Sequence, residues 1–185
     1  MKKLTMAMMA AAIMSPLTYA ANTVITIGAS EEIIDVNPYV GEITIDMTGI
    51  RVQHEFDNDI NLTVFYKEGM PDRVLQDRQT RTELMVGSNI RIKSVDLYGD
   101  IGYGQNQDSV SYKIINGGAF IPLTSDIFAH VNYLYRDEPS NATVRASYYI
   151  GYKVCDELVV QVGTGNTSGA DYDMKHAALT LSYIF

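Results

Sequence analysis

The sequence predicts one all-β domain: an antiparallel up-and-down transmembrane β-barrel of ten strands, with eight strands as the alternative. Three observations predict it. Apolar and polar side chains alternate with a period of two along most of the chain, as in strands that separate lipid from a polar lumen. Compact polar turns recur at regular spacing, and the chain ends on an aromatic residue, Phe185, after an N-terminal export signal.

The N-terminus has the pattern of a secretory signal peptide. Lys2 and Lys3 precede an apolar stretch over residues 6–14, and a small-x-small cleavage site follows at Thr18-Tyr19-Ala20. A retained membrane helix requires about 20 apolar residues, which is more than this stretch supplies. We therefore expect a cleavable signal peptide at 1–20 and a barrel domain at 21–185.

Short polar turns and longer connections alternate along the mature chain. The short turns are Asp57-Asn58-Asp59, Lys93-Ser94, Thr124-Ser125-Asp126 and Cys155-Asp156-Glu157. The longer connections are expected at 29–40, 69–79, 105–108, 137–141 and 165–172. Outer-membrane barrels have short periplasmic turns and longer external loops, so the short turns are assigned to the periplasm.

Each strand is assigned from its alternation. The first is expected at 23–28 and the second within 42–56. In the later strands the apolar residues that would face lipid are Ile60, Leu62, Val64 and Tyr66; Leu84, Val86, Ile90 and Ile92; Val95, Leu97, Ile101 and Tyr103; Ile127, Ala129, Val131, Tyr133 and Tyr135; Ala142, Val144, Ala146, Tyr148, Ile150, Tyr152 and Val154; and Ala177, Leu179, Leu181, Tyr183 and Phe185.

Two segments change phase. The apolar parity shifts at Thr48-Gly49 within 42–56 and near Asn116-Gly117-Gly118 within 109–123. Glycine at a change of parity predicts a β-bulge or a bend in the strand.

The opposite face carries charged residues that would line the lumen. The predicted lumen charge network consists of Lys67, Arg81, Glu83, Arg91, Asp96, Asp100, Lys113, His130, Arg136 and Arg145. The interior of a barrel of this size is narrow enough for side chains to fill, and burying one charge without its partner is costly. The network is therefore either a structural core of ion pairs or a narrow, gated ion path.

These features together resemble the small outer-membrane β-barrel proteins of Gram-negative bacteria, of the OmpX and OmpA-barrel type in the porin-like superfamily. The resemblance covers residues 21–185 and implies assembly by the barrel insertion machinery, which reads aromatic residues at the last and third-last positions. Phe185 and Tyr183 match that signal, whereas Thr180 and Ala178 depart from it, and the subfamily is left open. The resemblance also implies an outer-membrane location and contact with its lipids and lipopolysaccharide, and we expect a monomer.

An enzyme of the omptin or lipid A-modifying type is an alternative, since barrels of those types carry catalytic residues near the outer rim. The candidates here are His176 with Asp171 and Asp173. Asp173 and His176 are three residues apart, so a regular strand points them to opposite faces. No catalytic residue, metal site or cofactor is predicted, and the protein is interpreted as non-enzymatic.

Net charge and cysteine count exclude further classes of partner and of stabilising bond. The formal net charge of −8 argues against nucleic acid as a partner, and one cysteine, Cys155, excludes an intrachain disulfide. The expected role is structural, a surface interaction or a narrow pore. A soluble secreted barrel of lipocalin type is a further alternative, in which the same alternation would place the apolar residues inside.

Overall fold

The structure, a computed structural model, describes residues 22–35, 42–56, 59–72, 78–139, 142–169 and 173–185. The predicted signal peptide at 1–20 lies outside these residues. Ten strands occur in them: β1 (Thr23–Asp35), β2 (Glu42–Glu55), β3 (Ile60–Pro71), β4 (Gln79–Ile92), β5 (Val95–Asn106), β6 (Ser111–Pro122), β7 (Ile127–Asp137), β8 (Thr143–Lys153), β9 (Leu158–Ser168) and β10 (Asp173–Ile184). Every strand is long enough to cross a bilayer when tilted.

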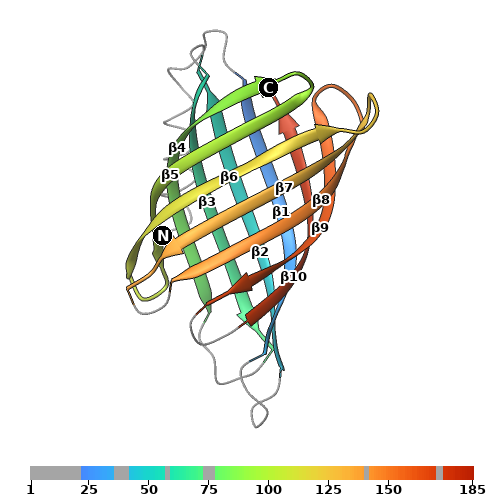
Figure 1. The fold of residues 1–185 in the computed structure, drawn as a ribbon. Coiled ribbons are helices and arrows are strands. Elements are labelled where there is room, and N and C mark those ends of the chain that lie inside the picture. Colours follow the sequence, from blue (N-terminus) through green and yellow to red (C-terminus); the bar gives the residue numbers. More distant parts are fainter. Residues whose placement is uncertain (1–21, 36–41, 57–58, 73–77, 140–141, 170–172) are drawn as a thin grey trace.

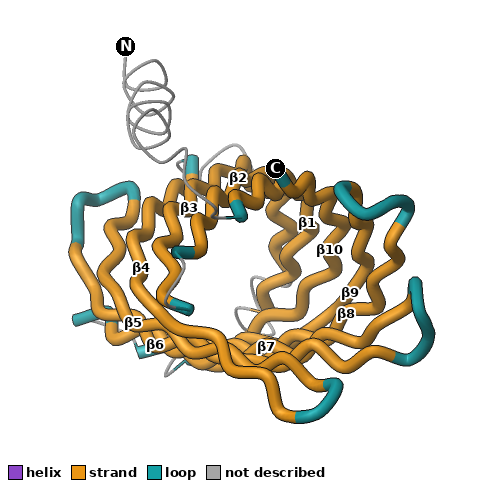
Figure 2. Tube along the Cα trace, turned by 90° about the horizontal axis from the view of Figure 1, so that it is seen from above, coloured by secondary structure: helices purple, strands orange, loops and turns teal. Residues whose placement is uncertain are grey.

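The strands close into a ring (Figures 1 and 2). Each pairs antiparallel with its neighbours in sequence, and β1 closes the ring against β10 from Val24↔Ile184 to Asp35↔Asp173. Closure matters because it leaves no strand edge with unpaired backbone groups. The prediction of a ten-stranded up-and-down barrel is confirmed, and the eight-stranded alternative is excluded.

The two ends of the barrel differ. We call the end with the connections 56–59, 93–94, 123–126 and 154–157 the turn end; it also holds the start of β1 and the end of β10 and is at the top of Figure 1. The opposite end, with the connections 36–41, 72–78, 107–110, 138–142 and 169–172, is called the loop end. Positive φ angles at Asp59 (60°) and Lys93 (57°) allow two of the tight turns at the turn end.

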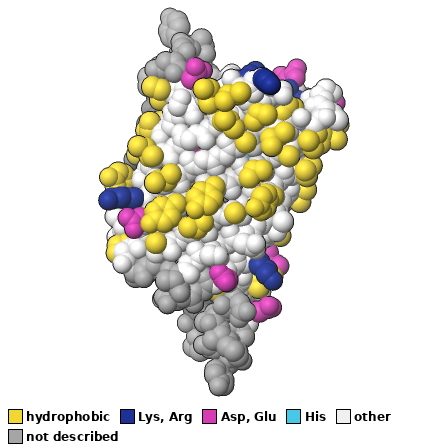
Figure 3. All heavy atoms as spheres, in the orientation of Figure 1, with side chains coloured by type: hydrophobic (Ala, Val, Ile, Leu, Met, Phe, Trp, Pro, Cys, Tyr) yellow, Lys and Arg dark blue, Asp and Glu magenta, His cyan; other side chains and the backbone are white. Residues whose placement is uncertain are grey.

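The outer wall is apolar and the inner wall is polar. Leu84, Ile101 and Val162 are between 52% and 68% exposed, whereas the inward-facing Asn61 and Glu83 are at most 2% exposed. Hydrophobic side chains spread over the wall in Figure 3. A soluble barrel would place its apolar side chains in the core, so this distribution does not fit the lipocalin-like alternative.

The bulges predicted at the two changes of phase do not occur. Pairing is continuous through Gly49, from Thr23↔His54 to Asp35↔Glu42, and also through the glycines of β6. In both segments the strand stays regular and its apolar residues turn inward towards the loop end. Ile43, Ile45 and Met47 pack together with Ile34, and Tyr112 and Ile114 pack with Met85 and Leu134. The prediction was wrong because two apolar clusters lie inside the lumen.

The first strand is longer than predicted. Residues 29–40 were expected to form a connection, but β1 runs to Asp35 and pairs on both sides, with Glu31↔Asp46 in β2 and Glu31↔Ala177 in β10. Backbone hydrogen bonds to two neighbours hold this polar segment in the wall. The extension matters because it places Glu32 in the lumen, where it is 7% exposed.

Candidate functional site in the barrel lumen

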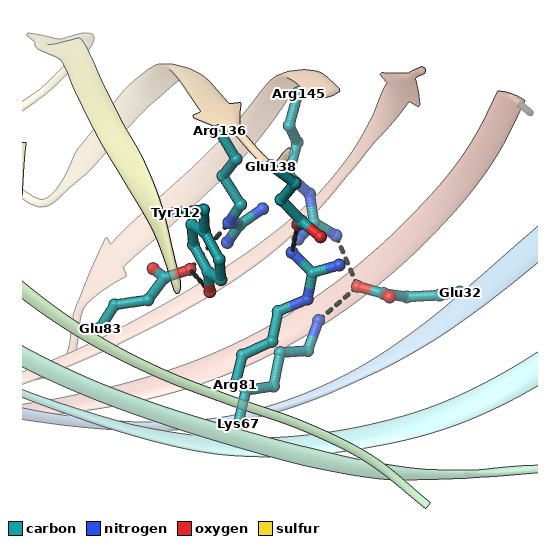
Figure 4. Close-up of polar contacts among 8 residues, drawn as sticks. All are labelled: Glu32, Lys67, Arg81, Glu83, Tyr112, Arg136, Glu138 and Arg145. Atoms are coloured by element: carbon teal, nitrogen blue, oxygen red, sulfur yellow. Dashed lines mark hydrogen bonds and ion pairs between the residues drawn. The ribbon is translucent and has the colours of Figure 1, made fainter. Parts of the chain in front are cut away.

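A group of charged side chains reaches into the lumen from several strands (Figure 4). We call it the lumen charge cluster; its charged members are Glu32, Lys67, Arg81, Glu83, Arg136, Glu138 and Arg145, and the neutral Tyr112 hydroxyl completes it as a donor. All except Glu138 lie on strands, and their register places them on the inward face. The cluster is the largest set of buried charges among the described residues.

Glu32 is the centre of one half of the cluster. Its Oε1 accepts hydrogen bonds from Lys67 Nζ and from Arg145 Nη2, the latter at 2.7 Å. The three side chains are between 9% and 14% exposed. One carboxylate therefore bridges two buried cations.

Glu83 organises the other half. Its Oε1 accepts from Arg136 Nε at 2.7 Å and from the Tyr112 hydroxyl at 2.9 Å. The Arg136 and Glu83 side chains are 6% and 2% exposed. Nearby, Arg81 Nη1 donates to Glu138 Oε1 at 2.7 Å, so each carboxylate of the cluster has at least one cationic partner.

The bridges cross the lumen. Lys67 is on β3 and Arg145 on β8, which are five strands apart in the ring of ten and so lie on opposite walls, yet both bind Glu32 on β1. Glu83 on β4 and Arg136 on β7 span three strands. These bonds therefore run across the width of the lumen and not along one wall.

The buried ion pairs stabilise the lumen charge cluster mainly because they prevent a single charge from being buried without a partner. A charge removed from water is expensive, and a pair offsets that cost only when hydrogen bonds satisfy both partners. Glu32 and Glu83 each accept from two donors, which meets this condition. Removing one carboxylate would strand at least one cation in the lumen.

The predicted lumen residues fall into four groups. Lys67, Arg81, Glu83, Arg136 and Arg145 meet in the cluster. Asp100 and His130 lie elsewhere in the lumen, Arg91 and Asp96 pair with each other at the exposed turn end, and Lys113 lies outside.

Lys113 corrects one prediction. It is exposed on the outer face of β6 beside Ile115, because the inward positions of that strand are Tyr112, Ile114 and Asn116. The expected change of phase had assigned it to the lumen, and the regular register places it outside.

Sequence reasoning missed Glu32, Glu138 and Tyr112 as members of the cluster. Glu32 and Glu138 fell in segments expected to be connections, and Tyr112 was not assigned to either face. Alternation continues through β1, where the even-numbered Val24, Thr26 and Gly28 line the lumen. Extending that parity to Glu32 is the signal that could have found it.

A second set of polar contacts lies closer to the turn end. We call it the amide–phenol network: Asp100, Asn116, Asn132, Tyr98, His130 and Gln161. Asn116 Nδ2 donates to Asp100 at 2.7 Å, and Asn132 Nδ2 donates to Asn116 Oδ1 and to the Tyr98 oxygen, both at 2.7 Å. Most of these residues belong to β5, β6 and β7, so the network follows one wall.

His130 ends this network in a defined protonation pattern. Gln161 Oε1 can only accept, so His130 Nδ1 donates to it at 3.1 Å, and the neutral ring then accepts the Tyr98 hydroxyl proton at Nε2, at 2.8 Å. The ring also stacks on Phe120, with centroids 4.1 Å apart, and on Tyr149, at 5.3 Å. Both nitrogens and both faces are therefore occupied.

A cavity of about 390 Å³ lies between the charge cluster and the turn end. Lys67, Arg136 and Arg145 border it on the cluster side, and Val24 and Ile184 border it where β1 and β10 meet at the turn end. Its volume is in the range of small-molecule sites.

The rim candidates for catalysis do not assemble. Asp171 lies outside the described residues, Asp173 is exposed, and His176 is 3% exposed inside the lumen. The serine that approaches His176 is Ser147 on β8, with Oγ 3.2 Å from Nε2. Arg145 Nε donates to His176 Nδ1 at 3.4 Å, so Nε2 carries the ring proton and donates to the serine. A catalytic base needs the reverse, a free nitrogen facing the hydroxyl.

Other kinds of site have little support. Within the described residues, no three His, Cys, Asp or Glu side chains lie close enough to hold a metal ion. None of the described segments is a helix with the length and apolar character needed to span a membrane.

At the C-terminus, the rings of Tyr183 and Phe185 are exposed and in edge contact, with centroids 4.7 Å apart.

Solved structures with the same architecture identify the fold. An outer membrane channel from Pseudomonas putida F1 superposes with a TM-score of 0.55 at 9% identity, over 92% of this chain and 99% of that one. The chain has the outer-membrane β-barrel fold. The translocator domain of the autotransporter NalP from Neisseria meningitidis is also similar, with a TM-score of 0.50 at 6% identity, over 98% of this chain and 95% of that one.

The likeness is one of architecture. No protein-family model and no curated protein matches the sequence. Outer-membrane β-barrels carry out unrelated tasks on a shared scaffold, so the fold alone does not determine the role of this one.

Proposed function

We propose that the protein is an integral outer-membrane barrel, without enzymatic activity, whose lumen is closed at rest by the charge cluster. The apolar outer wall supports membrane insertion, since a band of exposed Leu, Ile, Val and Tyr is stable only in contact with lipid. The short connections of the turn end would face the periplasm and the longer ones the exterior.

The observation that carries the closed lumen is the bridge through Glu32. Lys67 and Arg145 come from opposite walls to one carboxylate, so ions cannot cross that level without displacing buried, paired charges. The bridge supports a sealed scaffold over an open pore.

Conductance in planar bilayers tests this proposal. The wild-type barrel is expected to give no discrete current steps, whereas the triple variant Glu32→Ala, Lys67→Ala, Arg145→Ala removes the bridge without leaving an unpaired charge there and is expected to conduct. The matched control is Arg91→Ala with Asp96→Ala, which deletes an exposed pair at the turn end. Equal steps in wild type and triple variant would refute the closed lumen.

Membrane insertion has its own test. We expect the mature chain to fold only with detergent or lipid and to migrate differently on a gel before and after boiling. Deleting Phe185 is expected to slow insertion by the barrel assembly machinery while leaving detergent refolding intact. Folding of the wild type in plain buffer would contradict the membrane assignment.

A further inference from the structure

The cavity between the charge cluster and the turn end has an unusual pair of facing walls. On one side is Arg51 of β2, whose guanidinium lies 5.9 Å from the centre of the Phe65 ring. On the other side are the rings of Phe120, His130 and Tyr149. Strands β2 and β7 are five apart in the ring of ten, so Arg51 and His130 face each other across the lumen.

Arg51 differs from every arginine of the charge cluster. It forms no hydrogen bond and no ion pair with any described residue, whereas Arg81, Arg136 and Arg145 each bind a carboxylate. The half-buried guanidinium therefore presents its donors to the cavity without an anion to receive them.

The aromatic side of the cavity is held rigid before any ligand arrives. His130 is fixed by Tyr98 and Gln161 and stacked between Phe120 and Tyr149, as described above. Binding to a wall that is already ordered avoids the cost of ordering side chains. Rings fixed in this way offer apolar contact to a flat molecule but no counter-charge.

We propose that this cavity binds a small organic anion with a flat apolar body, such as an aromatic carboxylate, entering from the turn end. Its carboxylate pairs with Arg51, and its ring packs against the side of the stack that Phe120, His130 and Tyr149 form. The cavity volume of about 390 Å³ holds a molecule of this size. The charge cluster forms the far wall, and its own carboxylates are already occupied.

The binding can be tested without reference to conduction. The folded full-length mature protein in detergent micelles is titrated with 4-fluorobenzoate, and fluorine NMR follows the bound fraction. The neutral 4-fluorobenzamide has almost the same shape and serves as the matched ligand. We expect the carboxylate to bind and the amide to bind at least tenfold more weakly, because charge-assisted hydrogen bonds are the stronger ones.

Two variants locate the site. Arg51→Gln keeps the chain length and removes the cation, and it is expected to weaken 4-fluorobenzoate roughly ten- to a hundredfold, the effect of losing a hydrogen bond to a charged group. Arg91→Gln removes an arginine outside the cavity and is expected to leave affinity unchanged. Heat-modifiable migration of each variant confirms that it is folded.

Three results would overturn the proposal. They are no saturable binding of 4-fluorobenzoate by the wild type beyond that of empty micelles, equal affinity for the acid and the amide, and equal losses in Arg51→Gln and Arg91→Gln. None of them bears on whether the lumen conducts, so this inference and the proposed function fail independently.

Discussion

The lumen charge cluster and the amide–phenol network pair their buried polar groups in different ways. At the charge cluster, ionised groups on β1, β3 and β8 meet in the middle, and the lumen is crossed. At the amide–phenol network, short amide, phenol and carboxylate groups bond mostly between β5, β6 and β7 and stay on one wall. Long charged side chains can reach across a barrel, whereas short amides reach only a near neighbour. The cavity therefore lies beside the network.

The largest expected effect comes from breaking the bridge at Glu32. Glu32→Gln leaves Lys67 and Arg145 buried without a carboxylate and is expected to lower the free energy of unfolding by about 3–5 kcal/mol. Urea unfolding in lipid vesicles measures it. Adding Lys67→Met to this variant is expected to restore part of the loss, because it removes one stranded charge. A loss below about 1 kcal/mol in Glu32→Gln would mean that the cluster is solvated and does not close the lumen.

The second-largest loss of stability is expected in the amide–phenol network. Asn132→Ala removes the donor shared by Tyr98, Asn116 and the Gly117 carbonyl, and leaving such groups unpaired costs about 1–3 kcal/mol. The same unfolding assay reports it. The variant is also expected to keep the lumen closed in planar bilayers, since the charge cluster is intact. Current steps in Asn132→Ala would show that closure depends on both levels.

A smaller effect is expected at Gly118. A methyl group there would collide with the Tyr98 hydroxyl and the Val131 carbonyl, so Gly118→Ala is expected to cost about 1–2 kcal/mol, within the range of overpacking, because the backbone at Val131 must shift as well as the Tyr98 side chain. Gly99→Ala is the matched control, because its new methyl group would meet no other atom within 4 Å. Equal stabilities of the two variants would mean that Tyr98 and the backbone at Val131 both move aside without cost.

The smallest effect is expected at the exposed pair of the turn end. Arg91 and Asp96 pair through both carboxylate oxygens, but their side chains are 72% and 41% exposed. Water and salt screen such a pair, so Asp96→Asn is expected to leave the unfolding curve unchanged within error. A measurable loss would show that this pair, which the sequence placed in the same network as the cluster, acts as a buried one.

The sequence predicted the barrel because alternation is a local property. Residues such as Tyr148 and Ile150 reveal their face from their neighbours alone, and the turn at Lys93-Ser94 needs only short-range information. The inward position of the apolar residues Ile43 and Tyr112 was missed because a lipid-facing residue and a core residue have the same chemistry. Only the strand register distinguishes them.

The partners inside the lumen could not be predicted in the same way. Glu32 is 35 residues from Lys67 and 113 from Arg145, and these contacts exist only because the ring brings β1, β3 and β8 to one level. The candidate ligand site is also a product of closure. Arg51 is unexceptional in the sequence, and it becomes notable only because it forms no hydrogen bond and no ion pair with the described residues around it.

The separation between Glu32 and Arg145 has a kinetic consequence. A sheet of the first three strands can already join Glu32 to Lys67, but Arg145 reaches the same carboxylate only when β10 meets β1 and the ring closes. Contacts between such distant residues slow folding, because the chain loses its entropy before they form. Arg145 is thus a reporter of the final step: a probe at this position should respond only when the last strand has docked.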